Sequence, residues 1–124
     1  MRKLRIIIPM LSFALVIILL RFVFYIGYIP TESMEPTIPA RSRIIGIRIF
    51  DELHTGDIIV FEYEGTNMVK RIAACPGDTV GDSLLVPDDC YYVLGDNSIE
   101  SYDSRYWAEP FVHRDNIKAR SLFR

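Results

Sequence analysis

Three absences shape the interpretation of this 124-residue sequence. Residues 1–28 contain no acidic side chain, no Gly/Ser-rich linker or internal repeat is present, and no helical periodicity persists over three turns beyond residue 30. These absences exclude a long flexible spacer and a helical bundle. They predict two directly joined parts, an N-terminal segment 1–28 and one small domain 29–124.

An apolar run of membrane-spanning length fills most of residues 1–28. As a helix, Ile6 to Ile26 would span about 31 Å at about 1.5 Å per residue, enough to cross one hydrocarbon core. Arg21 would lie near enough to the far end for its side chain to snorkel to the interface. Four aromatic residues are predicted to form a belt there: Phe22, Phe24, Tyr25 and Tyr28.

The charges around this run predict its orientation. Arg2, Lys3 and Arg5 precede the run and are expected to stay in the cytoplasm. The chain would then cross the cell membrane once, with residues 29–124 on the extracytoplasmic side. A cleavable secretory signal is the competing interpretation, but no A-x-A-like site follows the run, which favours an uncleaved anchor.

The domain beyond the anchor is acidic. Four of the 14 Lys and Arg residues lie in residues 1–28, so the remaining 96 residues carry 10 bases against 16 acids, a net charge of −6. A nucleic-acid-binding domain has the opposite balance, so no nucleic-acid partner is expected.

Short runs rich in β-branched and aromatic residues alternate in this domain with turn signals such as HTGD, EGTN and PGD. The runs are RIIGIRIF (43–50), DIIVFEY (57–63), NMVKRIAA (67–74), SLLVP (83–87) and YYVLGD (91–96). We therefore predict a mainly β fold, in which a single N-terminal transmembrane helix is followed by a small antiparallel, partly barrel-like β domain.

The segment PTESMEPT (30–37) holds one serine, Ser33, between two prolines that exclude a helix interior. A serine hydroxyl is a weak nucleophile unless a neighbouring base takes its proton. Beyond the anchor only four side chains are candidates for that base: His54, His113, Lys70 and Lys118. Both histidines lie near turn signals or polar residues, where an exposed loop position is the simpler interpretation.

Lys70 lies within the predicted strand 67–74, where alternation puts Met68, Lys70 and Ile72 on one face. Apolar neighbours would leave the amine poorly hydrated and favour its neutral form, which can accept a proton. An exposed lysine on an edge strand fits the same spacing. The spacing alone leaves both interpretations open.

A third polar segment, GDNSIESYDSRYW (95–107), is ambiguous by itself. A solvated loop has this composition, and Asp103 with Arg105 could form a surface ion pair worth under about 1 kcal/mol. The order of the three segments, however, resembles the type I signal peptidases, membrane-bound serine proteases with a Ser-Lys dyad. The resemblance covers nearly the whole chain: an N-terminal anchor, SMEPT (33–37), GDIIVF (56–61), VKRIAACPGD (69–78) and GDNSIESYDSR (95–105).

The resemblance implies a role for each matching residue. Ser33 would be the nucleophile and Lys70 the general base, with Thr31 and the Ser33 backbone N–H donating to the oxyanion. Ser101 would hydrogen-bond to the lysine amine and orient it. The other supporting residues would be Gly95 and Asp96, which begin the turn beneath the site, and Asp103 and Arg105, which form an ion pair that holds the loop.

The resemblance also implies the substrates and partners. Preproteins that carry signal peptides would bind as an extended strand beside residues 30–33 and the strand of Lys70. Six residues would line shallow pockets that accept alanine and reject bulk: Ile29, Pro30, Met34, Ile38, Met68 and Val69. The enzyme would remove signal peptides at A-x-A sites beside the lipid bilayer, and it is expected to need neither metal nor cofactor.

The sequence departs from the family pattern in places. Only 16 residues separate Asp78 from Gly95, so the large inserted second domain of many members is absent and the chain is a short form. IPARSRIIG follows SMEPT where the family usually has a GD turn. SYDSRYW is similar to the branch that matures pilins and conjugation proteins, whereas GDN is similar to the general enzymes.

The alternative to an active peptidase is a catalytically silent, membrane-anchored β module that binds extended peptides.

Cys75 and Cys90 are the only cysteines, and both fall in the part predicted to be extracytoplasmic, where disulfides persist. Cys75 precedes the PGD turn and Cys90 opens the run YYVL. With 14 residues between them, two strand ends could meet, and a bridge would stabilise the domain by about 3 kcal/mol. Two buried free thiols are the alternative.

Overall fold

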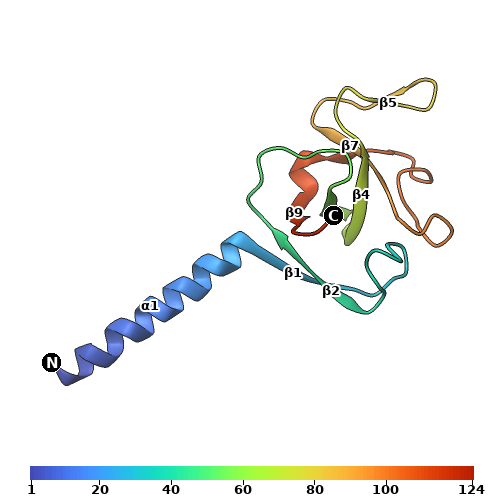
Figure 1. Ribbon diagram of the computed structural model, residues 1–124. Helices are drawn as coiled ribbons and strands as arrows, with labels where there is room; N and C mark the ends of the chain where they lie inside the picture. Colours follow the sequence, from blue (N-terminus) through green and yellow to red (C-terminus); the bar gives the residue numbers. More distant parts are fainter.

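A long helix, α1 (Arg2–Val23), leads into the sheet with no linker between them (Figure 1). The computed structural model describes residues 1–124. An 18-residue window of α1 has a mean hydropathy of 2.7 and no buried residue, so the helix is long and apolar enough to cross a membrane.

The helix ends earlier than predicted, because residues 24–29 form a strand. The strand β1 (Phe24–Ile29) pairs with β2 (Ser42–Ile47) over all six residues, which satisfies backbone groups that a longer helix would have bonded internally. The predicted boundary between residues 28 and 29 therefore falls inside β1. Of the aromatic residues predicted to form a belt, only Phe22 lies on the helix.

Each of the five predicted runs contains a strand, which confirms the mainly β prediction. The remaining strands are β3 (Ile58–Tyr63), β4 (Thr66–Ala74), β5 (Thr79–Val80), β6 (Leu84–Leu85), β7 (Cys90–Leu94), β8 (Val112–His113) and β9 (Ile117–Ser121). A short 3₁₀ turn, Arg114–Asn116, joins β8 to β9. The sequence runs did not reveal β1, β5, β8 or β9.

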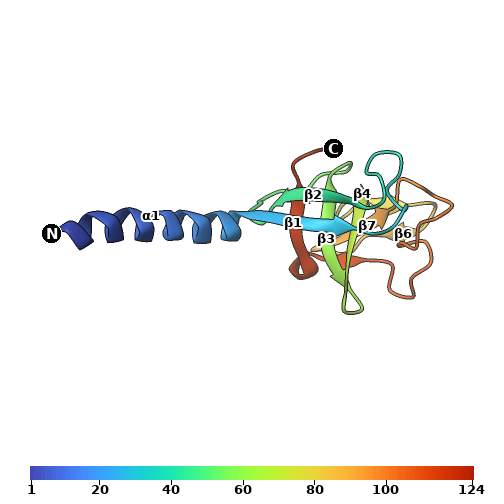
Figure 2. The same cartoon turned by 90° about the horizontal axis from the view of Figure 1, so that it is seen from below.

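Seven strands form one antiparallel sheet in the order β1-β2-β9-β3-β4-β7-β8, and β5 and β6 form a separate hairpin. The sheet is strongly coiled, so that β1 and β2 cross in front of β3 and β4 (Figure 2). Its two edges do not pair, and the fold is a partly closed barrel, as the sequence predicts.

The central strand β3 is buried on both faces and divides the core in two. Ile58 and Val60 pack with Ile29 and Met34 on one face. Ile59 and Phe61 pack on the other face, in a cluster that includes Trp107, Ile72 and Leu53. A strand covered on both sides has a continuous apolar run, and IIVF at 58–61 is such a run.

A two-residue turn, Glu64 and Gly65, joins β3 to β4 and fixes their register. Both residues have positive φ values, 48° and 78°, the conformation that tight hairpins require and that glycine adopts at little cost. This register pairs Lys70 with Ile59 near the middle of the sheet, rather than at an exposed edge. The lysine is therefore buried on an inner strand and does not lie on an edge strand, which decides between the two interpretations that the spacing left open.

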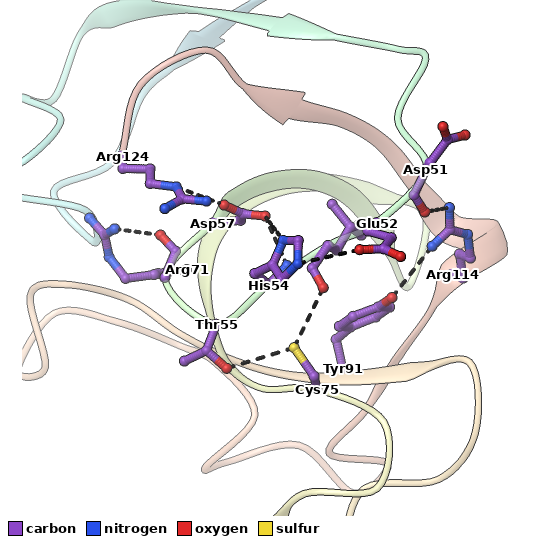
Figure 3. A network of polar contacts seen from close by, with 12 residues as sticks. Asp51, Glu52, His54, Thr55, Asp57, Arg71, Cys75, Tyr91, Arg114 and Arg124 are labelled. Carbon is purple, nitrogen blue, oxygen red and sulfur yellow. Dashed lines mark hydrogen bonds and ion pairs between the residues drawn. The ribbon is translucent and has the colours of Figure 1, made fainter.

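The predicted disulfide between Cys75 and Cys90 is not formed, and both cysteines are free thiols. Cys75 packs against the Trp107 cluster, and its thiol lies 3.7 Å from both the Leu53 carbonyl oxygen and the Thr55 hydroxyl (Figure 3). Cys90 packs instead with Ala74, Val86 and Tyr92. The two side chains therefore pack in different core clusters, which keeps the thiols apart.

Candidate active site

Ser33 and Lys70 meet although 37 positions separate them in sequence. Ser33 lies in the loop between β1 and β2, and Lys70 lies in β4. The Lys70 Nζ donates a hydrogen bond of 2.6 Å to the Ser33 Oγ, and the two residues are only 5% and 4% exposed. The Thr31 hydroxyl lies 3.3 Å from the same oxygen.

Burial weakens the affinity of the Lys70 amine for its proton. Removal of the amine from water lowers its pKa below the ordinary 10.5, and the charge of Asp103 opposes this only in part. No carboxylate forms an ion pair with Lys70. The arrangement thus places a poorly hydrated amine within proton-transfer distance of a hydroxyl.

Two contacts fix the loop that carries Ser33. Met34 is fully buried in the core beneath the loop, and the Asn97 backbone N–H donates to the Ser33 carbonyl oxygen at 2.9 Å. Met34 therefore holds the loop from the β3 side, while Asn97 holds it from the third polar segment. Ser33 is held at its position by packing on one side and by a hydrogen bond on the other.

The third polar segment is organised around the buried carboxylate of Asp103. Asp103 accepts hydrogen bonds from the Gly95 backbone N–H at 2.9 Å, the Ser101 hydroxyl at 2.7 Å and the Arg105 guanidinium at 2.9 Å. Burial alone would raise the pKa of Asp103, but these bonds outweigh it and lower the pKa to about 2. The predicted ion pair with Arg105 is present, and it is not a loose surface pair because Asp103 has no exposed surface.

Ser101 has a different partner from the one that the resemblance implies. Its hydroxyl donates to Asp103, and no hydrogen bond joins it to Lys70. Gly95 explains the close packing here, because a Cβ at Gly95 would lie 2.0 Å from the Ser101 Oγ and 2.6 Å from the Ser33 carbonyl oxygen. Only glycine leaves room for both Ser33 and Ser101 beside this position.

Arg71 is a structural residue that the sequence interpretation missed. Its Nε and Nη2 donate to the two carboxylate oxygens of Asp96 at 2.8 Å each, and its Nη1 donates to the Gly56 carbonyl oxygen at 2.7 Å. This forked ion pair ties the residue after Lys70 to the turn that begins the third segment. The spacing of charges in the sequence carried no signal of it, since the two residues lie 25 positions apart.

A cavity of about 240 Å³ opens beside Ser33 and Lys70. Four of the six predicted pocket residues line it: Ile29, Pro30, Met68 and Val69. Met34 and Ile38 do not, because Met34 is fully buried and Ile38 packs against the same cluster. The sequence interpretation missed five lining residues: Tyr28, Thr66, Asn67, Glu100 and Tyr102. Tyr28 directly precedes the predicted pocket residue Ile29, and Glu100 and Tyr102 flank Ser101.

The histidines form no part of this site. His54 lies near Glu52 and Asp57, and its side chain is 59% exposed (Figure 3). His113 lies near Asp115, with a side chain that is 49% exposed. Neither lines the cavity. Lys118, the other candidate base, pairs with Glu62 at 3.0 Å. Lys70 is therefore the one candidate base that the structure brings to Ser33.

We expect Asp103→Asn to destabilise the protein and to make its stability depend less on pH in acid. The folded-state pKa of Asp103 is about 2 against an ordinary 3.8, so its ionisation adds stability on the order of 2 kcal/mol above pH 3.8, which is lost as the pH falls toward 2. Thermal unfolding of both proteins in detergent along an acid pH series measures this. The gap between wild type and variant should narrow through that window, and a constant gap would contradict the assignment.

Comparison with known proteins identifies the family. The family model "Signal peptidase, peptidase S26" matches residues 2–83 and 80–124. The chain is 34% identical to "Probable signal peptidase I-2" of Synechocystis sp., over 83% of this chain and 63% of that protein. It is 33% identical to signal peptidase I of Leptolyngbya laminosa, over 92% of this chain and 74% of that protein. Signal peptidase I of Bacillus amyloliquefaciens is 30% identical, over 77% and 72%.

The match of the family model covers almost every residue, including the helix and all three polar segments. The chain spans slightly less than two thirds of the Synechocystis protein and about three quarters of the Leptolyngbya protein. The chain therefore belongs to the signal peptidase family, peptidase S26, and is a signal peptidase I-like peptidase.

Proposed function

We propose that this chain removes N-terminal signal peptides from exported proteins at the membrane surface, with Ser33 as nucleophile and Lys70 as general base. The observation that carries the proposal is the 2.6 Å hydrogen bond between two buried side chains, the Lys70 amine and the Ser33 hydroxyl. Family membership supports the reaction, because the relatives in cyanobacteria and bacilli are named signal peptidase I.

The geometry supports a two-step acyl transfer. Ser33 Oγ attacks the carbonyl carbon of the scissile peptide bond while its proton passes to neutral Lys70 Nζ. The Ser33 N–H and the Thr31 hydroxyl donate to the oxyanion. Lys70 then gives its proton to the leaving amine, and an ester on Ser33 remains. Water, deprotonated by Lys70, hydrolyses the ester and restores the hydroxyl.

The cavity supports a preference for small side chains beside the scissile bond. Its volume of about 240 Å³ is below the range of ordinary ligand pockets, and Ile29, Met68 and Val69 form part of its wall. The edge strand β1 and the strand β4 both border the cavity, so an extended peptide could bind between them in the manner of an added strand. An A-x-A sequence fits these features.

The anchor supports action at the bilayer. Ser33 lies ten residues after Val23, the last residue of α1, and four residues after the end of β1. We propose that α1 crosses the membrane once with the basic N-terminus in the cytoplasm, so that the sheet is extracytoplasmic. Anchoring confines enzyme and signal peptide to one plane, which favours their encounter and restricts cleavage to bonds near the lipid.

Thr31→Val is expected to lower kcat about 100-fold while leaving the structure intact. Valine has nearly the shape of threonine but cannot donate a hydrogen bond to the oxyanion. The Thr31 hydroxyl lies 3.3 Å from the Ser33 Oγ, so it is near where the oxyanion forms. Steady-state cleavage of a preprotein measures the effect, and Thr31→Ser, which keeps the hydroxyl, should retain most of the activity. Equal rates for Thr31→Val and wild type would remove Thr31 from the mechanism.

The experiment that tests the function is cleavage of a model preprotein in detergent, with the products identified by mass. Wild type should release the mature protein at its A-x-A site, and a preprotein with leucine in place of the alanine before the scissile bond should stay intact. A wild-type protein that binds the preprotein without cleaving it would favour the catalytically silent peptide-binding module.

A further inference from the structure

A second cavity lies where the helix meets the sheet, away from Ser33. It has a volume of about 550 Å³, and seven residues line it: Ile17, Leu20, Arg21, Phe24, Ile26, Ile45 and Arg48. Five of the seven are apolar and two are arginines, while none is acidic. The lining residues come from the last turns of α1, from β1, and from β2 and the residue that follows it. Figures 1 and 2 show how α1 leads into β1 beside β2.

Both arginines line this cavity, and backbone contacts hold one of them, Arg48, in place. The Arg48 N–H donates to the Val23 carbonyl oxygen at 2.8 Å, which fastens the end of β2 to the last turn of the helix that carries Arg21. The Arg48 Nε donates to the Phe24 carbonyl oxygen at 3.1 Å, and its guanidinium carbon lies 5.0 Å from the centre of the Tyr25 ring. Arg48 is therefore held in place rather than free in solution.

These guanidinium groups have unused donors. Neither Arg21 nor Arg48 forms an ion pair, and the two Nη groups of Arg48 have no protein partner. Arg21 has no side-chain hydrogen bond at all. A phosphate group fits paired guanidinium donors because its oxygens accept forked hydrogen bonds.

The apolar wall indicates the rest of the ligand. Ile26 and Ile45 are direct partners across β1 and β2, and both are largely exposed, at 68% and 42%. Leu20 and Ile17 continue this surface along the helix, toward the centre of the proposed membrane span. A ligand with a phosphate at the arginine end and a hydrocarbon chain along the isoleucines and leucine would match both parts.

We propose that this cavity binds one phospholipid with an anionic headgroup, from the leaflet next to the β domain. Its phosphate lies between Arg21 and Arg48, and an acyl chain lies along Ile26, Ile45 and Leu20. Zwitterionic lipids fit less well, because their ammonium group would find no carboxylate among the lining residues. Arginines beside the exported end of a membrane helix run against the usual charge bias, and a bound anionic lipid gives them a partner.

The proposal rests on the proposed membrane anchoring and not on the proposed catalysis. Binding is therefore measured by the mass of lipid retained on the full chain, in a native mass spectrum recorded after detergent release. Phosphatidylglycerol and phosphatidylcholine with identical acyl chains are the two probes. The Ser33→Ala variant should bind as wild type does, so that a failure of the lipid site and a failure of the peptidase activity are distinguishable.

Wild type should retain phosphatidylglycerol in clear preference to phosphatidylcholine. Arg21→Gln and Arg48→Gln should each weaken phosphatidylglycerol retention about fivefold, and the double variant about 25-fold. Arg43→Gln is the matched control, because Arg43 is also on β2 but pairs with Tyr28 at the other end of the hairpin. Arg21→Gln decides the matter if Arg48→Gln fails to fold, since Arg21 makes no side-chain bond within the protein.

Three results would overturn the proposal. They are equal retention of the two lipids by wild type, unchanged phosphatidylglycerol retention by Arg21→Gln, and a loss in Arg43→Gln as large as that in Arg21→Gln. The last outcome would show a diffuse attraction between a basic surface and anionic lipid, rather than binding in the cavity.

Discussion

Replacing Lys70 with methionine is expected to abolish preprotein cleavage, by about 10⁴-fold or more, and to leave a folded protein. Methionine replaces the unbranched apolar stem of lysine but lacks the terminal amine, which lies 2.6 Å from the Ser33 hydroxyl, and so supplies no base. Ser33→Ala should be equally inactive, and the double variant no worse than either single one, because neither half of the pair works alone.

The pH dependence follows from the direction of the Lys70 pKa. Burial lowers this pKa below 10.5, and only the neutral amine accepts the Ser33 proton. The wild-type rate should therefore rise with pH through the lowered pKa and then level off. Between that pKa and 10.5 the unfolded chain binds more protons than the folded one, so wild-type stability rises with pH there.

The same reasoning predicts that Lys70→Met is more stable than wild type near neutral pH. The buried amine disfavours folding most where the unfolded lysine is charged, and methionine removes that penalty. The stability difference should shrink as the pH approaches 10.5. Thermal unfolding in detergent at several pH values measures it, beside the cleavage assay.

Lys118→Met is the matched control, because Lys118 is a partly exposed lysine that pairs with Glu62. It should cleave the preprotein at close to the wild-type rate and show no pH-dependent gain in stability. Full activity of Lys70→Met would contradict the role of Lys70 as general base. His54 and His113 would then be the remaining histidine candidates for the base.

Gly95→Ala should cause the second-largest loss, although it adds only one methyl group. The new Cβ would lie 2.0 Å from the Ser101 Oγ, 2.5 Å from the Ser101 Cβ and 2.6 Å from the Ser33 carbonyl oxygen. Real Cβ atoms do not approach other atoms so closely, so either Ser33 or the Asp103 loop must move. We expect about 1–3 kcal/mol of destabilisation and at least a 100-fold loss of kcat, since displacement of a nucleophile by about 1 Å has that effect.

Gly65→Asn is the control for this substitution. Gly65 has open space around it, and its positive φ of 78° is one that asparagine tolerates. The control should fold and cleave almost as wild type does. A Gly95→Ala protein with normal kcat and normal thermal stability would mean that Ser33 and Ser101 are less closely packed than the structure has them.

Local sequence pattern predicted the helix and five of the nine strands, and it missed β1, β5, β8 and β9. The apolar run predicted a helix that could cross a membrane, and the five β-rich runs each contain a strand. The alternation around Lys70 predicted that Met68 and Ile72 share a face, and both pack against the same core cluster. These features depend on neighbours within a few positions, and such neighbours are readable from the chain.

The tertiary structure decided which distant residues meet. The sheet order and its coiling bring the loop after β1 over β4, and this places Ser33 on Lys70. They also place the Ser101 hydroxyl within hydrogen-bond distance of Asp103 and not of Lys70. Cys75 and Cys90 come to lie in different core clusters. Periodicity fixes the face on which a side chain lies, but it does not specify which strand will cover that face. The curvature of the sheet and the packing of both faces of β3 determine that, and they exist only once the whole domain has folded.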